Sequence, residues 1–249
     1  MIQGEADSNA GGLNCFHPLV RDARAVLFDA GGTLVHPDWN RIARVARAET
    51  GREFTHAEMR RTLYEALRAV DARLSEEQAR AAAHTRQPGW LFRDMFCALG
   101  VDEEACERMA QPMLALHNER HLWCVPDSDA PRVIADLKRA GLRVGVISNT
   151  EDGRARETVE EVVGQLDLLV DSHLVGLRKP DAAIFHHALE ELKVAAREAV
   201  YVGDSYGHDV LGAQSAGLRA ILLDPLDFYA ESDCPRIHQL KELTEDAGC

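Results

Sequence analysis

The sequence predicts an α/β fold in which a parallel sheet is accompanied by an inserted all-helical segment. From Pro126 onward, short apolar runs of strand length alternate with helical segments of about 10–14 residues, the order expected of parallel βαβ units. Between residues 36 and 125 the apolar residues recur instead at the three- to four-residue spacing of helices. These two patterns indicate a sheet domain interrupted by a helical one.

The first predicted strand organises the sheet. Residues 25–28 (A-V-L-F) form a short apolar run followed by a Gly-Gly turn, which is typical of a buried parallel strand that ends in a tight loop. Asp29 stands where this strand stops, and ligands bind at the carboxyl ends of strands in open α/β sheets. Asp29 can be a nucleophile, a metal ligand or a turn former. In an isolated Asp-x-Gly-Gly the turn former would be the commonest role.

Composition argues against several classes of protein. A hydrophobic content of 46% and a charged content of 28% are those of an ordinary soluble globular chain. The net charge of −13 argues against nonspecific binding to nucleic acid or an anionic membrane, and no apolar run reaches the length of a membrane span. The first residues lack the apolar core of a signal peptide, so a cytoplasmic protein with reduced cysteines is expected. Residues 1–22, polar and Gly-containing, are expected to form a flexible tail.

Four helices are predicted in the inserted segment. Asp38 can cap the first, which should end near Gly51, and Thr55 with Glu58 has the spacing of a capping box at the start of the second. The last two carry apolar stripes that contain Trp90, Leu91, Met95, Phe96 and Leu99 in one and Met109, Met113 and Leu116 in the other. Stripes with this period are mostly core, so these residues are predicted to pack together.

The rest of the chain alternates strand and helix. Asp129 and Pro131 open a helix that Gly141 ends. The elements that follow are a strand over 142–147, a helix from Asp152, a strand over 168–170, a helix capped by Asp181, a strand over 199–202, a short helix ended by Gly217 and a strand over 220–223. Connections of this kind make the strands parallel.

Several chemically distinctive residues fall near the ends of these strands. They are Asp29 with Thr33, Ser148 with Asn149, Asp204 with Asp209, and Lys179 in a loop before the Asp181 helix. Taken singly, each is most often a turn, cap or loop residue. Parallel strands bring their carboxyl ends to one edge of the sheet. There a carboxylate can attack phosphorus, others can hold a hard cation, and a hydroxyl and a lysine can neutralise phosphoryl oxygens. Together they predict a site of phosphoryl transfer.

Three stretches of the chain resemble the haloacid dehalogenase (HAD) superfamily, in its capped phosphatase-like branch. They are F-D-A-G-G-T-L, V-I-S-N-T, and R-K-P-D-A-A-I-F running on to V-Y-V-G-D-S-Y-G-H-D-V-L-G-A-Q-S-A-G. Their order and separations match the family over about residues 24–224. The resemblance implies a Rossmann-like core, a parallel sheet with helices on both faces, made of residues 23–35 and 126–249, with residues 36–125 as the inserted helical cap domain.

The resemblance also implies roles for the residues at the sheet edge. Asp29 would be the nucleophile that forms an aspartyl-phosphate, and Lys179 would orient it. Mg²⁺ would be held by the Asp29 carboxylate, the Gly31 carbonyl and Asp204, with Asp209 supporting the waters of the ion. The phosphoryl group would be bound by Gly32, Thr33, Ser148, Asn149 and Lys179.

One position departs from the family pattern. The phosphatases carry a second Asp two residues after the nucleophile, which protonates the leaving alcohol and then activates water, and this chain has Gly31 there. Positioned acid–base catalysis contributes about 10²–10⁴ in rate, so the loss weakens phosphomonoester hydrolysis. A side chain at position 31 is expected to point toward the leaving oxygen. Substitute acids could come from His36, His208 or the cap residues His56, His84, His117 and His121.

The sequence therefore predicts a HAD-like hydrolase, a Mg²⁺-dependent phosphatase of a small phosphorylated metabolite with an altered acid–base step. A protein that keeps the pocket only for binding or regulation is the main alternative, favoured by Gly31. A dehalogenase is less favoured because such enzymes typically lack the metal-binding acid that Asp204 would be. Phosphonate cleavage is excluded because residues 36–125 contain no lysine. No nucleic-acid or membrane partner is expected, and the chain is expected to be a monomer or homodimer.

Overall fold

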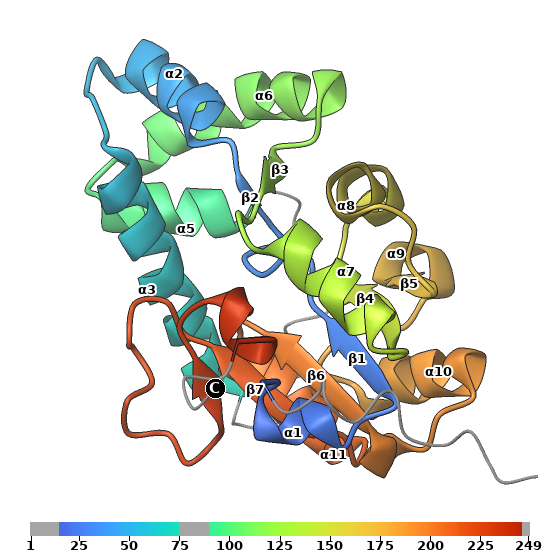
Figure 1. The fold of residues 1–249 in the computed structure, drawn as a ribbon. Coiled ribbons are helices and arrows are strands. Elements are labelled where there is room, and N and C mark those ends of the chain that lie inside the picture. Colours follow the sequence, from blue (N-terminus) through green and yellow to red (C-terminus); the bar gives the residue numbers. More distant parts are fainter. Residues whose placement is uncertain (1–14, 75–89, 246–249) are drawn as a thin grey trace, which may run out of the picture.

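A computed structural model describes residues 15–74 and 90–245 of the chain (Figure 1). Its centre is a six-stranded sheet in the order β5-β4-β1-β6-β7-β8, and every neighbouring pair runs parallel. The strands are β1 (Ala25–Phe28), β4 (Arg143–Ser148), β5 (Leu168–Asp171), β6 (Ala199–Gly203), β7 (Arg219–Leu223) and β8 (Arg236–Ile237). The predicted α/β fold is confirmed.

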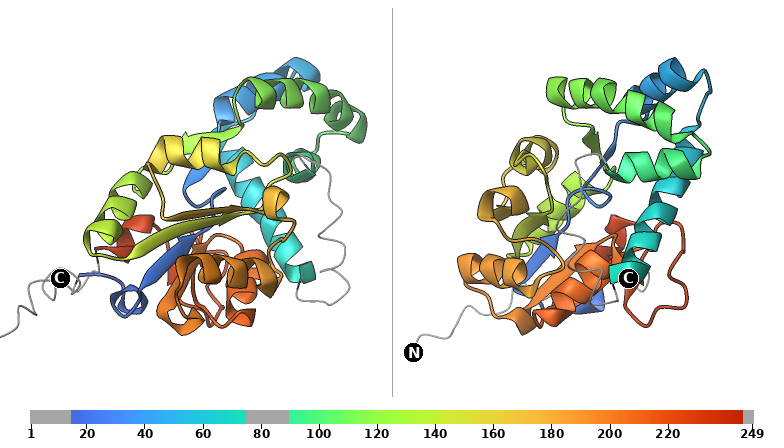
Figure 2. Two further views of the ribbon diagram at one scale, coloured as in Figure 1. Left: turned by 90° about the vertical axis from the view of Figure 1, so that its right-hand side faces the viewer. Right: turned by 180° about the vertical axis from the view of Figure 1, so that it is seen from behind.

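Helices cover both faces of this sheet (Figure 2). They are α1 (Pro18–Arg21), α7 (Ala130–Arg139), α8 (Ala155–Val163), α9 (Ser172–Val175), α10 (Ala182–Leu192) and α11 (Gly212–Ser215), with the 3₁₀ turns η1 (Ala196–Glu198) and η3 (Leu240–Leu243) and the π-helical segment η2 (Tyr206–Leu211). Residues of β1 alternate between the faces. Val26 and Phe28 pack with α1, α7 and α8, whereas Ala25 and Leu27 pack with α10 and α11. The unbroken apolar run of β1 is therefore buried from both sides.

A second group of helices lies beside the sheet domain and has its own apolar core (Figure 1). It contains α2 (Trp39–Thr50), α3 (His56–Leu74), α5 (Trp90–Ala98) and α6 (Glu103–Glu119). A two-stranded antiparallel ribbon of β2 (Val35–Pro37) and β3 (Trp123–Pro126) connects this group to the sheet domain. We call these helices the cap and β2 with β3 the ribbon.

The caps of the first two helices follow the predicted side chains. Asp38 accepts a hydrogen bond from the Arg41 amide at 3.1 Å, and α2 ends at Gly51 with a φ of 68°. Thr55 Oγ1 accepts from the Glu58 amide and Glu58 Oε2 accepts from the Thr55 amide, each at 3.2 Å. These local signals set where α2 and α3 begin.

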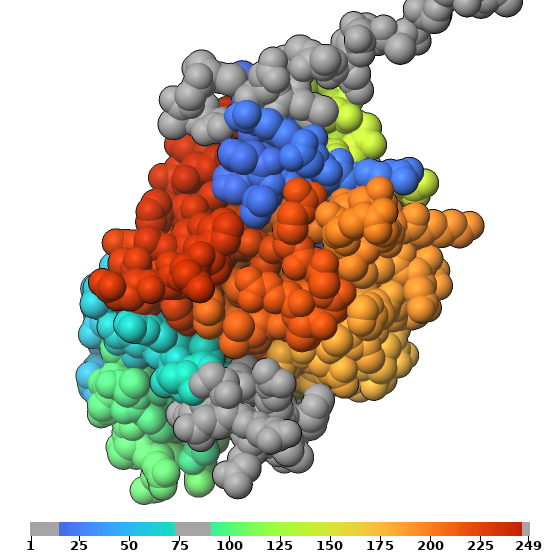
Figure 3. All heavy atoms as spheres, turned by 90° about the horizontal axis from the view of Figure 1, so that it is seen from below, coloured from blue at the N-terminus to red at the C-terminus, as the bar shows by residue number. Residues whose placement is uncertain are grey.

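The expected flexible tail is partly structured. Of residues 1–22, the first 14 lie outside the described residues, but α1 packs on the sheet and buries Phe16 and Val20. The His17 amide also donates to the Leu243 carbonyl at 3.0 Å. Figure 3 shows this segment in blue beside the C-terminal part of the chain in red. The segment from Phe16 onward therefore belongs to the core.

The cysteines also differ from expectation. Cys15 is disulfide-bonded, so the expectation of reduced thiols throughout is wrong. Four cysteines among the described residues are free, namely Cys97, Cys106, Cys124 and Cys234.

The sequence pattern does not predict the ribbon or β8. These strands have two to four residues, which is too few for an alternating apolar pattern to be recognised in the sequence. The helix expected from Asp152 begins instead at Ala155. Among the helices of the described residues, none has the length and hydropathy needed to cross a bilayer.

A buried carboxylate joins the cap to the sheet domain. Asp71 of α3 is 4% exposed and accepts hydrogen bonds from Ser205 Oγ at 2.6 Å and from the amides of Tyr206 and Gly207 at 2.9 Å. The Tyr229 hydroxyl also donates to it. Burial raises the pKa of Asp71 to about 6, although these donors oppose the shift. Asp71 thereby ties α3 to the loop between β6 and η2.

Replacing Asp71 should destabilise the whole protein. We expect Asp71→Ala to lower the free energy of unfolding by about 3 kcal/mol, because it leaves several buried donors without an acceptor. Glu65→Ala on the same helix is the control, since it removes only an exposed pair with Arg61 and should cost less than about 0.5 kcal/mol. Urea denaturation measures both. Equal losses in the two variants would contradict the anchoring role of Asp71.

Candidate active site

Three carboxylates meet at the carboxyl edge of the sheet. Asp29 directly follows β1, Asp204 directly follows β6, and Asp209 lies in η2. One oxygen of each lies within 4.8 Å of the others. Because β1 and β6 are paired in parallel, with the Asp29 amide donating to the Val202 carbonyl at 2.9 Å, the ends of the two strands coincide. We call this group the carboxylate cluster.

One buried ammonium group is held within the cluster. Lys179 Nζ donates to Asp29 Oδ1 at 2.5 Å, to Asp209 Oδ1 at 2.7 Å and to the Tyr201 hydroxyl at 3.0 Å. Asn149 holds the backbone of this lysine: its Nδ2 donates to the Lys179 carbonyl and its Oδ1 accepts from the Lys179 amide, both at 2.9 Å. The lysine loop is thereby fixed to the end of β4, where Asn149 lies.

Burial and repulsion shift the pKa values of these groups. Desolvation raises the pKa of Asp29 to about 6, with Asp209 adding to the shift and Lys179 opposing it. Burial, Asp29 and Asp209 raise the pKa of Asp204 well above its usual range. Burial alone would lower the pKa of Lys179, but Asp209 and Asp29 raise it well above its usual range. The lysine therefore stays protonated.

The donor set of the cluster fits a hard divalent cation. A single ammonium group cannot neutralise three carboxylates, and all three are less than a tenth exposed. Unbalanced charge in such a setting is costly, and a cation would remove the cost. Carboxylate oxygens are the ligands that Mg²⁺ prefers. The residues present therefore suit Mg²⁺.

Two glycines allow the backbone to approach the carboxylates closely. A Cβ at Gly32, whose φ is 92°, would lie 1.9 Å from Asp204 Oδ2. A Cβ at Gly203 would lie 2.3 Å from Asp209 Oδ2. Any larger residue would displace these carboxylates, so both positions require glycine.

Position 31 does not open toward free space. A Cβ on Gly31 would lie 3.2 Å from Cε3 of Trp123, the first residue of β3. The indole thus occupies the space into which a side chain at position 31 would extend. A side chain there would therefore contact the indole, and its direction toward a leaving oxygen stays a prediction.

The predicted phosphoryl-binding residues occupy different environments. Ser148 ends β4 and lines the cavity described below, as does Gly32, whose carbonyl accepts from the Tyr64 hydroxyl at 3.2 Å. Thr33 is fully buried and is absent from the cavity lining. Its Oγ1 has no hydrogen-bond partner among the described residues. The contact between Thr33 and a phosphoryl group stays a prediction.

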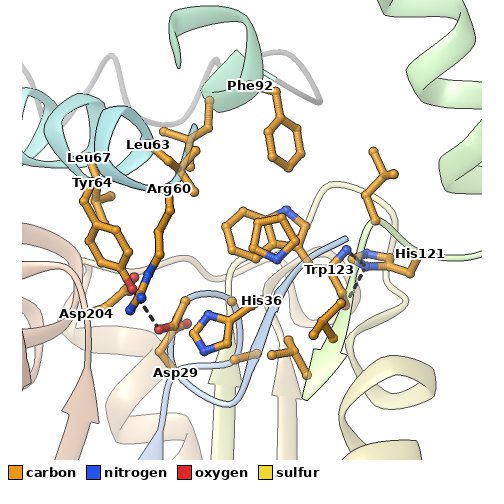
Figure 4. Close-up of a pocket in the computed structure, with 18 of the residues that line it drawn as sticks. Asp29, His36, Arg60, Leu63, Tyr64, Leu67, Phe92, His121, Trp123 and Asp204 are labelled. Atoms are coloured by element: carbon orange, nitrogen blue, oxygen red, sulfur yellow. Dashed lines mark hydrogen bonds between the residues drawn. The ribbon is translucent and has the colours of Figure 1, made fainter. Parts of the chain in front are cut away.

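A cavity of about 1280 Å³ lies over the carboxylate cluster, between the sheet domain and the cap. Its cap side is largely apolar and includes Leu63, Phe92 and the indole of Trp123, which the close-up shows above Asp29 (Figure 4). Arg60 of α3 extends from the cap toward the carboxylates (Figure 4). The cavity therefore combines an acidic floor, apolar walls and two arginines contributed by the cap, Arg60 and Arg93.

Comparison with known proteins agrees with this architecture. The sequence model of the haloacid dehalogenase-like hydrolases matches residues 23–217. The chain belongs to this HAD hydrolase family.

Relatives within the HAD family include named phosphatases. The chain is 30% identical over 215 residues to glyceraldehyde 3-phosphate phosphatase of Methanothermobacter thermautotrophicus, covering 84% of this chain and 89% of the relative. It is 32% identical over 189 residues to phosphoserine phosphatase of Thermus thermophilus, covering 72% and 74%. The fold is similar to that of the HAD-hydrolase YfnB from Bacillus subtilis bound to magnesium, with a TM-score of 0.61, 18% identity and coverage of 89% and 96%.

The histidines considered as substitute acids fall into different positions in this HAD fold. His36 lies on the ribbon, and its Nε2 is 3.2 Å from Asp127 Oδ2. His117 lies on α6 of the cap, and its Nε2 is 2.7 Å from Asp152 Oδ2 of the sheet domain. This pair does not include a residue of the carboxylate cluster. The others that line the cavity are His56, His121 and His208, and His84 lies outside the described residues.

Sequence reasoning missed several side chains of the site. Tyr201 is the one polar residue in the apolar run of β6, and this exception was a usable signal for its hydroxyl contact with Lys179. Asp71, Trp123 and Asp127 gave no such signal, because their partners are remote in the sequence.

Mg²⁺ should stabilise this HAD hydrolase, and more strongly at alkaline pH. The pKa of Asp29 is about 6 in the fold against an ordinary 3.8, so folding favours its protonated form. The stability linked to Asp29 is present at low pH and is lost as the pH rises through about 6. A bound cation offsets this loss of stability only at pH values at which the carboxylates are ionised. Thermal melts with and without Mg²⁺ should show a larger gain in Tm at about pH 8 than at about pH 5.

Two variants separate this effect from general salt stabilisation. Asp204→Asn should lose most of the Mg²⁺-dependent gain, whereas Asp233→Asn, which alters an exposed carboxylate outside the cluster, should keep it. An equal gain at both pH values, or in both variants, would exclude the carboxylate cluster as the metal site.

Proposed function

We propose that the protein is a Mg²⁺-dependent phosphatase that hydrolyses a small phosphorylated metabolite through an aspartyl-phosphate on Asp29. The observation that carries the proposal is the placement of Asp29, whose carboxylate is paired with Lys179 at 2.5 Å on the floor of the 1280 Å³ cavity. Asp209 shares this lysine, but it is 1% exposed, whereas Asp29 is 7% exposed.

In this proposal Asp29 is the nucleophile. Its carboxylate oxygen attacks the phosphorus of a bound monoester while the alcohol leaves, and water then attacks the phosphorus and restores the carboxylate. Lys179 holds Asp29 in place and, with Ser148, offsets the charge of the phosphoryl oxygens. Asn149 acts through Lys179, because both hydrogen bonds of its side chain to described residues go to the backbone of that lysine.

Asp29, Asp204 and the Gly31 carbonyl would hold the Mg²⁺, with Asp209 beside them. The bound ion would offset the negative charge of the phosphoryl group. Asp209 has a further task that follows from its contacts: it accepts from Lys179 and from the Ser205 amide at 3.0 Å. It therefore fixes the loop that presents Asp204.

The cavity and the relatives both support the proposed substrate class. Relatives named for glyceraldehyde 3-phosphate and phosphoserine hydrolysis support a small phosphorylated substrate. The apolar cap side chains Leu63 and Phe92 would contact the carbon skeleton of the substrate. Arg60 would bind a second anionic group or a phosphoryl oxygen.

Two alternatives differ from this proposal in what they require. A protein that binds phosphate and metal without turnover is favoured by one observation, the indole of Trp123 over Gly31 where an acid is absent. A dehalogenase needs no metal, so the three clustered carboxylates disfavour it.

Phosphate release from aryl, acyl and alkyl phosphates tests the proposal directly. We expect turnover with Mg²⁺, its loss in EDTA, and a decrease of at least about 10³-fold in Asp29→Asn, since the amide has no nucleophilic oxygen anion. Thermal melting of the variant confirms that it folds. A near-normal rate in Asp29→Asn would remove Asp29 as the nucleophile.

The same panel distinguishes the alternatives. Full activity in excess EDTA would point to chemistry without a metal. Mg²⁺ and inorganic phosphate binding without turnover of any ester would favour the binding protein. Arg24→Gln alters an exposed residue outside the cavity lining. It serves as the control for activity that any variant loses during purification.

A further inference from the structure

We propose that His36, oriented by Asp127, supplies the general acid and base that Gly31 lacks. The inference rests on the proposed phosphatase function and deepens it, because an internal proton donor extends the substrates from activated aryl and acyl phosphates to ordinary alkyl phosphates. The leaving alkoxide of an alkyl phosphate needs a proton, whereas an aryloxide or a carboxylate leaves without one.

The ribbon places these two residues together in the lining of the cavity that holds the nucleophile. His36 is the middle residue of β2 and lies opposite Val125 of β3, and Asp127 immediately follows β3. The Asp127 amide donates to the Leu34 carbonyl at 2.9 Å, which extends the pairing to the end of the ribbon. Asp29, His36 and Asp127 all line the cavity, and the close-up draws His36 and Asp29 in the same region of it (Figure 4).

The hydrogen bonds of the pair suit a proton-transfer role. His36 Nε2 lies 3.2 Å from Asp127 Oδ2, and Asp127 Oδ1 accepts from the Asp129 amide at 2.9 Å. Burial acts to raise the pKa of Asp127, but the bonds from His36 and Asp129 outweigh it and the pKa lies below the usual range. An ionised Asp127 accepts a hydrogen bond from the Nε2–H group of His36, and this leaves Nδ1 for proton transfer. No described residue forms a hydrogen bond with Nδ1, so that atom is available to a ligand.

The same ribbon explains why position 31 is not the donor. Trp123 of β3 fills the space beyond Gly31, so an acidic side chain there would meet the indole. Trp123, the first residue of β3, therefore lies against Gly31. Asp127, which follows the last residue of β3, orients His36. Both features depend on one short antiparallel pairing.

Other protonated groups near the floor are less suited to the role. The Tyr64 hydroxyl donates to the Gly32 carbonyl, and burial raises its pKa well above the usual range, so it does not yield its proton. His121 lies on the far side of Trp123 from Asp29 in the close-up (Figure 4). His36 is the histidine that Figure 4 labels on the Asp29 side of the indole.

The proton balance closes over the two steps. In the first, an Asp29 oxygen bonds to phosphorus as the ester P–O bond breaks, and the proton on His36 Nδ1 passes to the leaving oxygen. In the second, neutral Nδ1 removes a proton from water as the water oxygen bonds to phosphorus. Phosphate leaves, and both the Asp29 carboxylate and the His36 imidazolium are restored.

The leaving-group dependence of kcat/KM in His36→Asn tests the assignment. With Mg²⁺ present, we expect kcat/KM for ethyl phosphate to fall by about 10²-fold and that for 4-nitrophenyl phosphate to change less than about threefold. Because the second step also loses its base, 4-nitrophenyl phosphate should give a burst of about one nitrophenolate per active site before a slow steady rate. His36→Gln serves as the second variant if thermal melting shows that the Asn form unfolds.

Two further variants complete the test. Asp127→Asn should show the same leaving-group selectivity with a smaller loss, because it acts only through His36. His186→Asn, which alters an exposed histidine outside the cavity lining, should show neither the selectivity nor the burst. Equal losses for both substrates, no loss, or a wild-type protein that hydrolyses only 4-nitrophenyl phosphate would overturn the role of His36. A wild-type protein that hydrolyses neither ester would instead overturn the proposed phosphatase function.

Discussion

The contacts of Lys179 with Asp29 and Asp209 hold the site together. Its ammonium group bonds two of the three buried carboxylates and the Tyr201 hydroxyl, and Asn149 clamps its backbone. A buried charge that loses its partner costs about 3–5 kcal/mol, so each member of this network depends on the others. The network also leaves a surplus of negative charge. The fold therefore maintains, at the edge of its central sheet, an arrangement that a divalent cation and a phosphoryl group would complete.

Two connections between the cap and the sheet domain differ in kind, and the bond from the Tyr64 hydroxyl to the Gly32 carbonyl adds a third contact. Asp71 bonds the loop that carries Asp204, so α3 is fixed to the sheet domain by a buried polar contact. The ribbon is the second connection, and it brings both Trp123 and His36 to the cavity. Gly31, two residues after the nucleophile, and the ribbon are therefore physically coupled, since a Cβ on Gly31 would lie 3.2 Å from the indole of Trp123 and the indole would have to shift slightly. Moving the catalytic acid from position 31 to another residue would therefore involve the ribbon as well as the loop that follows β1.

The sequence predicted the sheet and much of the carboxylate cluster because both follow from local signals. Asp29 and Asp204 end apolar strands, and parallel pairing alone brings such ends together. It could not predict contacts between residues 91 positions apart, as in His36 with Asp127, or 134 apart, as in Asp71 with Ser205. The ribbon was missed because its strands are too short to show a period. The role of Thr33 stays a prediction, because a motif gives the residue type but not the direction of its hydroxyl.

The measurement that tests the central claim most directly is the capture of a phosphorylated enzyme. The protein would be mixed with radiolabelled acetyl phosphate and Mg²⁺, quenched in acid within the first turnover, and digested for peptide mapping. The account predicts label of up to about one phosphoryl group per chain on the peptide that contains Asp29, and its absence when EDTA replaces Mg²⁺. Label on another peptide, or no label under conditions in which phosphate is released, would contradict the account.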